Sequence, residues 1–218
     1  MVEIFFLCAR RADLSHLAYS AHLLERHAPL ALQHHPRLRG YTVYDVEEAL
    51  PPAEPIDSVN ALAFDSLQDY ERGLYASVEG ERLVSEDHAR FLGGASGYAG
   101  HLRVLHDSGP APAHWLCALR RRAGLDAQRF SAELVPELLA GQPAATRVAL
   151  LEVERRLFPD AAPEWDAFLC LGFADAARRP VHPFASPDCA MSLRKAAAAL
   201  CAASALWRAQ AHVLRRAG

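Results

Sequence analysis

The residues best suited to chemistry in this sequence are its histidines. The chain has 11 of them, and seven lie at or before His101. Imidazole titrates near neutral pH, so a positioned histidine can accept and return a proton without a cofactor. The sequence has no P-loop, no GxGxxG after a strand, no HExxH and no GxSxG. Nucleotide binding, zinc hydrolysis and the α/β-hydrolase mechanism therefore lack their usual motifs.

The spacing of the possible metal ligands argues against a metal or redox site. The five cysteines are odd in number and no pair has CxxC spacing, which favours buried, reduced thiols; they are Cys8, Cys117, Cys170, Cys189 and Cys201. His22 and His27 lie five residues apart, roughly 140° around an α-helix, so they are not expected to share a ligand. We expect no metal and no cofactor.

Composition limits the class of protein. The chain has 218 residues, which corresponds to one large domain or two small ones, and its 51% hydrophobic content supports an ordinary core. A net charge of −3 argues against a nucleic-acid partner. No apolar run approaches the ~20 residues of a membrane span, and the apolar N-terminal stretch is too short for a secretory signal. We therefore expect a soluble, cytoplasmic protein without membrane contact.

The two halves of the chain repeat one another. The segment Leu7–Arg11 (LCARR) is similar to Leu116–Arg121 (LCALRR), and each is followed by a helix start, at Leu14 and at Leu125. These starts are 111 residues apart, about half the chain. Gly and Pro in residues 107–112 predict a linker. We therefore place a boundary near residue 110, between repeats 1–108 and 113–218.

The pattern of apolar residues predicts the same order of elements in each half. In the first half, helices are expected after Ser15 and Ser66 and over 82–91, with Leu17, Ala21, Leu24 and Ala28 as the apolar stripe of the first one. Strands are expected over 4–9, 40–46, 59–65 and 101–105. In the second half, strands are expected over 115–119, 148–153, 168–173 and 209–214, and helices over 126–140 and 192–205.

The order β-α-β-β-α-β in each half is typical of a ferredoxin-like unit. A lone four-stranded sheet with helices on one face leaves its other face bare, and a pair of such units can bury both bare faces. We therefore predict an α+β protein whose two repeats form a single-chain dimeric α/β-barrel-like unit, with the two sheets facing each other. It would be a monomeric pseudo-dimer or a homodimer.

Residues 4–107 resemble the EthD domain, a dimeric α/β-barrel family. Four segments carry the resemblance, and their order and spacing match the family's HAPL, PxLRxY, FDSL and DEARFL motifs; they are ERHAPL (25–30), PRLRGY (36–41), FDSL (64–67) and LVSEDHARFL (83–92). The second half resembles the family only through the repeat.

The resemblance implies a site in the first half. The residue that matches the family histidine is His27, and the matching acidic residue is Asp87. An aspartate beside the imidazole would fix its tautomer or handle a second proton. A structural alternative remains for each: His27 bonded to a backbone carbonyl, and Asp87 as a helix cap or in a salt bridge to Arg90. The second half has Leu138 at the position of His27, so one site per chain is expected.

Five further residues are expected to contact a substrate. They are Tyr41, Ala61, Ala63, Phe91 and His101. Ala61 and Ala63 are smaller than the residues common in the family, which would enlarge the pocket, and Tyr41 is favoured over Tyr44 as a hydrogen-bond donor. His101 could face the cavity or the surface. His34, His35 and His114 are interpreted as solvated or loop residues.

The leading hypothesis is a cofactor-independent acid–base enzyme. It would carry out a dehydration, cyclisation or decarboxylation of an aromatic or polyketide-like small molecule. A cofactorless monooxygenase and a non-catalytic carrier of a hydrophobic small molecule are the alternatives. The behaviour of His27 separates them, because a carrier needs the cavity but tolerates the loss of this imidazole.

Overall fold

A computed structural model of the chain describes residues 1–142, 144–158, 163–184 and 191–215. The elements of the first half are β1 (Val2–Arg10), α1 (His16–His22), the π-helical turn η1 (Leu23–His27), α2 (Ala28–His34), β2 (Gly40–Leu50), β3 (Ser58–Phe64), α3 (Leu67–Gly73), α4 (Val78–Phe91) and β4 (Leu92–Asp107). Those of the second half are β5 (Ala113–Arg121), α5 (Ala127–Gly141), β6 (Arg147–Arg156), β7 (Ala167–Phe173), the 3-10 turn η3 (Ala176–Arg178), α6 (Met191–Leu200) and β8 (Cys201–Arg215). Within these residues, no helix is long and apolar enough to cross a membrane.

The eight strands form one closed antiparallel barrel in the order β1-β3-β2-β8-β5-β7-β6-β4. The neighbours within each half follow the same pattern, β4-β1-β3-β2 and β8-β5-β7-β6. The two halves meet where β2 pairs with β8 and where β4 pairs with β6. An α+β fold with a barrel is thus confirmed, but the expectation of two separate sheets packed face to face is wrong. The edge strands are long enough to hydrogen-bond across the boundary, so the sheets join along both edges.

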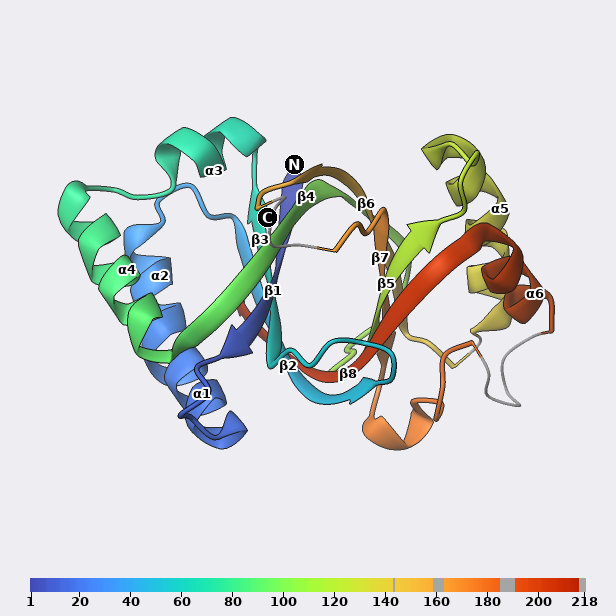
Figure 1. Cartoon of the computed structure of the whole chain (residues 1–218), viewed down its shortest axis with the longest axis horizontal. Coiled ribbons are helices and arrows are strands. Elements are labelled where there is room, and N and C mark those ends of the chain that lie inside the picture. The colour runs from blue at the N-terminus through green and yellow to red at the C-terminus, as the bar shows by residue number, and fades with distance from the viewer. Residues whose placement is uncertain (143, 159–162, 185–190, 216–218) are drawn as a thin grey trace.

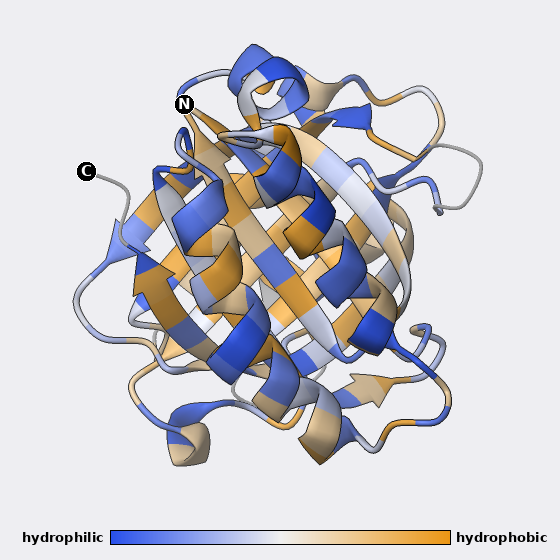
Figure 2. Ribbon diagram, turned by 90° about the vertical axis from the view of Figure 1, so that its left-hand side faces the viewer, coloured by the Kyte–Doolittle hydropathy of each residue, from blue (hydrophilic) through white to orange (hydrophobic). Residues whose placement is uncertain are grey.

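The helices cover opposite outer sides of the barrel. Helices α1 to α4 lie on one side, and α5 and α6 lie on the other (Figure 1). Figure 2 faces the first of these layers and shows hydrophobic and hydrophilic residues alternating along helices that cross the sheet. Three apolar clusters follow from this arrangement, one inside the barrel and one beneath each helical layer. Strands β3 and β7 are therefore buried on both faces along their whole length.

Strand β1 shows how the sequence accommodates two buried faces. Successive side chains of a strand point to opposite faces of the sheet. Phe5 and Leu7 point into the barrel, whereas Ile4 and Cys8 pack beneath the first helical layer. The near-continuous apolar run expected over residues 4–9 is the consequence of this double burial.

The apolar stripe expected on the first helix is wrong in part. Leu17 is 79% exposed, while Tyr19, Leu23 and Ala28 are buried. The helix does not keep an α-helical period, because η1 inserts a wider turn in which the N–H of Ala28 donates to the carbonyl of Leu23, five residues earlier. Pro29 directly follows this turn, and a proline ring inside a helix clashes with the carbonyl four residues before it. The wider turn relieves that clash and rotates the buried face.

The C-terminal boundary between helix and strand also differs from the expectation. A helix was expected over 192–205, but α6 ends at Leu200 and β8 begins at Cys201. Ala and Arg favour helix, yet β8 is hydrogen-bonded to β2 on one side and to β5 on the other. These two ladders override the local preference, and the strand expected over 209–214 is confirmed.

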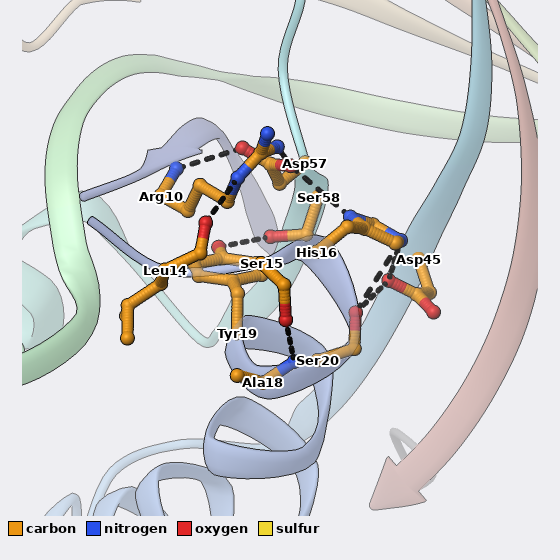
Figure 3. Close-up of polar contacts among 10 residues, drawn as sticks. All are labelled: Arg10, Leu14, Ser15, His16, Ala18, Tyr19, Ser20, Asp45, Asp57 and Ser58. Carbon is orange, nitrogen blue, oxygen red and sulfur yellow. Dashed lines mark hydrogen bonds and ion pairs between the residues drawn. The ribbon is translucent and has the colours of Figure 1, made fainter. Parts of the chain in front are cut away.

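An Arg–Asp pair fixes the start of the first helical layer to the sheet. The guanidinium of Arg10 bonds to the carboxylate of Asp57, whose Oδ2 also accepts from the Arg10 backbone N–H at 2.8 Å. The same guanidinium donates to the carbonyl of Leu14 at 2.9 Å. His16 lies between the carboxylates of Asp57 and Asp45, 3.0 and 3.4 Å from its ring nitrogens (Figure 3). Three strands and the entry to α1 are thereby joined.

The second half repeats this contact. Arg121 donates from its guanidinium to Oδ1 of Asp166 at 2.9 Å and from its backbone N–H to Oδ2 at 2.8 Å. Its guanidinium also donates to the carbonyl of Leu125 at 3.4 Å. Arg121 and Leu125 each follow their first-half counterparts by 111 residues, the spacing seen in the sequence.

A reciprocal pair of hydrogen bonds connects the halves inside the barrel. The hydroxyl of Tyr98 on β4 donates to the carbonyl of Pro163, between β6 and β7, at 3.0 Å. The indole N–H of Trp207 on β8 donates to the carbonyl of Glu54, between β2 and β3, at 2.9 Å. Each half thus holds the loop of the other.

The cysteines are described for four of their five positions. Cys8, Cys117, Cys170 and Cys201 are free thiols. Cys189 lies outside the described residues. Burial raises the pKa of Cys8 and Cys170 to about 12, so these thiols are inert at neutral pH.

Closure of the barrel is testable at Gly100, where a bulge lies in the β4–β6 pairing. A Cβ at this position would lie 1.9 Å from the carbonyl oxygen of Glu152, so Gly100→Ala forces the two halves apart. We expect the free energy of unfolding to fall by about 1–3 kcal/mol, the usual cost of overpacking. Gly94→Ala is the control, because a Cβ there has no neighbour within 4 Å. Urea denaturation measures both, and equal effects would contradict this account of closure.

Candidate functional site

The carboxylate of Asp87 lies between two imidazoles. Its Oδ2 is 3.0 Å from Nδ1 of His27, and its Oδ1 is 3.0 Å from Nε2 of His22. Asp87 comes from α4, His22 ends α1, and His27 ends η1. His27 and Asp87 are each only 5% exposed. The structure thus brings together the two residues expected to form the site.

The shared carboxylate shows that His22 and His27 point to the same side, contrary to the angular separation expected from the sequence. Five residues in an α-helix separate two side chains by roughly 140°. The π-helical turn hydrogen-bonds from i to i+5 and brings residues five apart onto one face. Both rings therefore reach Asp87. Pro29 is the sequence feature from which this wider turn could have been inferred.

Aromatic rings enclose the three polar side chains. Phe91 lies with its ring centroid 4.9 Å from that of His27 and is stacked on His22 at 4.8 Å. The ring of His88 lies 4.4 Å from that of His27. Tyr19 packs on Phe91 from the sheet side at 5.5 Å. Phe91, expected as a substrate contact, is thus part of the wall around His27.

Burial and hydrogen bonding determine the charges of the pair. Burial lowers the pKa of His27 to about 4, with the neighbouring His88 acting in the same direction and Asp87 against it. Burial alone would raise the pKa of the Asp87 carboxyl, but the hydrogen bonds from His27 and His22 outweigh it and leave that pKa below its ordinary value. At neutral pH His27 is neutral and Asp87 is ionised. The proton of His27 then lies on Nδ1, which donates to Asp87, and Nε2 carries the free lone pair.

Further observations concern the alternative roles considered for His27 and Asp87. The nearest guanidinium nitrogen of Arg90 is 3.8 Å from Asp87, so the expected salt bridge is present beside the histidine contacts. In the second half the position of His27 is occupied by Leu138, which is fully buried in the apolar cluster beneath α5 and α6. Among the described residues, no group of three or more His, Cys, Asp or Glu side chains could hold a metal ion.

The sheet separates His27 from two of the expected substrate contacts, Ala61 and Ala63. Tyr41 packs in the cluster beneath the first helical layer, whereas Ala61 lies inside the barrel. Ala63 and Tyr41 border a cavity at the barrel mouth that does not include His27. The expectation that Ala61 and Ala63 enlarge a pocket at His27 is therefore wrong, whereas Tyr41 packs on the same side of the sheet as Phe91, which contacts His27. Alternate residues of a strand face opposite ways, and odd-numbered residues of β3 face inward.

The structure places His101 at the surface, one of its two expected positions, and places His35 and His114 in more buried surroundings than expected. His101 is exposed on the outer face of β4, where Nδ1 is 2.9 Å from the carbonyl oxygen of Met1. His35 lies in the loop after α2, in line with its interpretation as a solvated or loop residue, but it is buried, with Nδ1 2.8 Å from the carbonyl oxygen of Leu74. His114 was interpreted as a loop residue, but it lies in β5 and is 2% exposed.

The barrel-mouth cavity has a volume of about 950 Å³ and contains polar residues that sequence reasoning missed. Glu3, Tyr44, His114 and Arg147 border it. Glu3 could have been found, because a carboxylate with the parity of Phe5 and Leu7 in an apolar strand must face the barrel. No comparable pattern marks Arg147, which begins β6.

Comparison with known families supports the resemblance of the first half. Residues 11–95 match the EthD domain, and this range includes His22, His27 and Asp87. The match covers less than half of the chain. A comparison with curated proteins finds no match.

Solved structures share the fold at low sequence identity. An anthrone oxidase-like protein is 11% identical with a TM-score of 0.64, over 97% of this chain and 92% of its own. A protein from Fusobacterium nucleatum, provisionally assigned as a monooxygenase, is 8% identical with a TM-score of 0.62, over 100% of this chain and 94% of its own. A mutant chlorite dismutase from Candidatus Nitrospira defluvii is 11% identical with a TM-score of 0.53, over 96% and 91%. These similarities show the fold.

The buried state of His27 predicts a pH dependence of stability. Its pKa in the folded protein, about 4, is below the ordinary 6.5, so between these values the unfolded chain binds more protons. The free energy of unfolding therefore falls as pH is lowered from 6.5 to 4. His27→Asn keeps a donor near the position of Nδ1 but does not titrate. We therefore expect the unfolding free energy of this variant to fall less steeply with decreasing pH, because its unfolding takes up about one proton fewer at most. Urea denaturation across this range measures it, and identical slopes would contradict the burial of a neutral His27.

Proposed function

We propose that this protein is a cofactor-independent acid–base enzyme acting on an aromatic or polyketide-like small molecule. The observation that carries the proposal is the 3.0 Å contact between Nδ1 of His27 and the Asp87 carboxylate. A carboxylate on one ring nitrogen fixes the tautomer, so the other nitrogen is the proton acceptor. The reaction class is dehydration, cyclisation or decarboxylation of an enolisable substrate.

The charges of the pair define the first step. Neutral His27 takes a proton at Nε2, and Asp87 stabilises the imidazolium that forms. His22, on the other carboxylate oxygen, holds Asp87 in place. A pKa of about 4 makes His27 a weak base, so the step suits an acidic C–H such as one flanked by carbonyl groups or fused to an aromatic ring. Phe91 offers such a substrate an aromatic wall.

The comparisons support an enzyme. The EthD match spans both members of the pair, and the structural neighbours include a chlorite dismutase and an anthrone oxidase-like protein. A second candidate, cofactorless oxygenation of an electron-rich aromatic molecule, is favoured by the neighbour assigned provisionally as a monooxygenase. The same proton removal would begin that reaction. A carrier of a hydrophobic small molecule is the non-catalytic candidate.

We also propose that residues 1–108 and 113–218 are ferredoxin-like repeats, of which the second has lost its site. The repeated Arg–Asp contacts and the shared strand order support this division. The second repeat then supplies the barrel half that a second subunit would otherwise provide. Leu138 fills the place of the imidazole with apolar packing.

A proton-exchange assay tests the role of His27. In D₂O, 2-tetralone exchanges its benzylic C–H on enolisation, and NMR follows the loss of signal. We expect the wild-type protein to accelerate this exchange and His27→Asn to lower the protein-dependent rate by roughly 10²–10⁴-fold, the usual general-base contribution. Asp87→Asn should lower it less, because Asp87 acts through the imidazole.

Leu138→Met is the matched control in the second repeat and should leave the rate unchanged. Thermal melts confirm that each variant is folded. Equal rates for wild type and a folded His27→Asn variant would refute acid–base catalysis by this residue. Unchanged binding of 2-tetralone in that variant would then favour the carrier.

A further inference from the structure

The barrel-mouth cavity lies on the other side of the sheet from His27. It is bordered by the first residues of β1, by the last residues of β8 and by the linker residues Gly109–Pro112. Three of its polar residues, Glu3, His114 and Arg147, lie outside the range that matches the EthD domain. None of these residues belongs to the Asp87 cluster, which consists of Asp87, His22 and His27.

Small side chains leave this end of the barrel open. An eight-stranded barrel is just wide enough for its inward side chains to fill it. Farther along the barrel that filling is done by aromatic residues such as Phe5, Phe168 and Trp207. At the mouth the inward positions are occupied by Ala63 on β3 and Ala211 on β8, and by Gly172 beside His114. The resulting space of about 950 Å³ is large enough for a small-molecule ligand.

Three inward side chains give the cavity a polar, nearly uncharged floor. Burial raises the pKa of Glu3 to about 7, with Arg147 partly opposing it. Burial also raises the pKa of Tyr44 and lowers that of His114 to about 4. Slightly below neutral pH, all three groups are therefore mostly neutral. Such a floor hydrogen-bonds to a neutral polar group more readily than it holds an ion.

His114 is a buried polar side chain without a partner. Neither ring nitrogen has a hydrogen bond within the described residues, although the carbonyl of Pro112 lies near enough to favour the protonated ring slightly. The ring packs edge-on against Tyr44, with centroids 5.0 Å apart. A buried imidazole with no partner costs about 1–3 kcal/mol. A neutral imidazole has one donor and one acceptor, which a hydroxyl or a carbonyl group can meet.

The rim of the cavity carries the charged side chains of Asp107, Arg147 and Arg215. Arg147 is bonded to Asp107 across the mouth. The charges of Arg147 and Asp107 thus largely neutralise each other, and Arg215 adds a further cation to the rim. The walls between rim and floor are apolar and include Leu102, Val104 and Val213.

We propose that the barrel mouth is a second small-molecule site, which takes a neutral aromatic molecule bearing a hydroxyl or carbonyl group. The ring system lies between the apolar walls, and its polar group bonds to His114 and Glu3 on the floor.

Binding of 2-naphthol to the full chain at pH 6 tests the proposal. Calorimetry should show saturable 1:1 binding, at least about tenfold tighter than that of naphthalene, which lacks the hydroxyl. With ¹⁵N-labelled histidine, the ring signals of His114 should shift on titration and those of His27 should not.

Substitutions assign the contacts. His114→Phe keeps the ring but loses both polar atoms and should weaken 2-naphthol binding at least about tenfold. Glu3→Gln keeps a donor and an acceptor and should change it by less than about threefold. Ala211→Trp should abolish it by filling the mouth. His27→Asn is the matched control and should leave it unchanged.

Several results would overturn the proposal. Among them are the absence of saturable 2-naphthol binding, equal affinity for naphthalene, and ring signals that shift at His27 instead of His114. The labelled wild-type protein decides the matter even where a variant fails to fold. Because these measurements read binding and not proton exchange, they can fail while the proposed acid–base function holds, and the reverse.

Discussion

The backbone hydrogen bonds at the two seams of the barrel are the constraint on which the rest of the structure depends. A strand at the edge of a sheet exposes a row of unpaired N–H and C=O groups. Here β2 is completed only by β8, and β4 only by β6, so each half satisfies the edges of the other. The Tyr98 and Trp207 side chains then tie each half to a loop of its partner. Closure explains why β8 is a strand despite its alanines and arginines.

Closure also separates the two places where chemistry is plausible. The sheet has two buried faces, one beneath the helices and one inside the barrel. The Asp87 cluster belongs to the first, and its geometry depends on a π-helical turn that aligns His22 with His27. Glu3 on β1 and His114 on β5 belong to the face inside the barrel. They border the same cavity because closure brings strands of both halves into one barrel. Neighbouring residues of one strand point to opposite faces, so a shift of one residue would move a side chain from the barrel interior to the face beneath the helices.

The sequence predicted those features that depend on local pattern or on repetition. Apolar runs located the strands, the 111-residue offset indicated that the two halves share an order of elements, and the EthD motifs paired His27 with Asp87. Features that depend on distant neighbours were missed. The pairing of β8 with β2 decides where α6 ends, the wider turn before Pro29 decides which residues of the first helix are buried, and burial within the barrel, not local sequence, places His114 in a cavity.

The mutual completion of the edges has a consequence for synthesis of the chain. A ribosome adds roughly 5–20 residues per second, so the second half follows the first by several seconds or more. During that time β2 and β4 have no partner, and their unpaired backbones are templates for association with other nascent chains. The 11 residues of β2 and the 16 of β4 are long for exposed edges. Chaperone binding at this stage, and not the stability of the finished barrel, would then set the yield of folded protein.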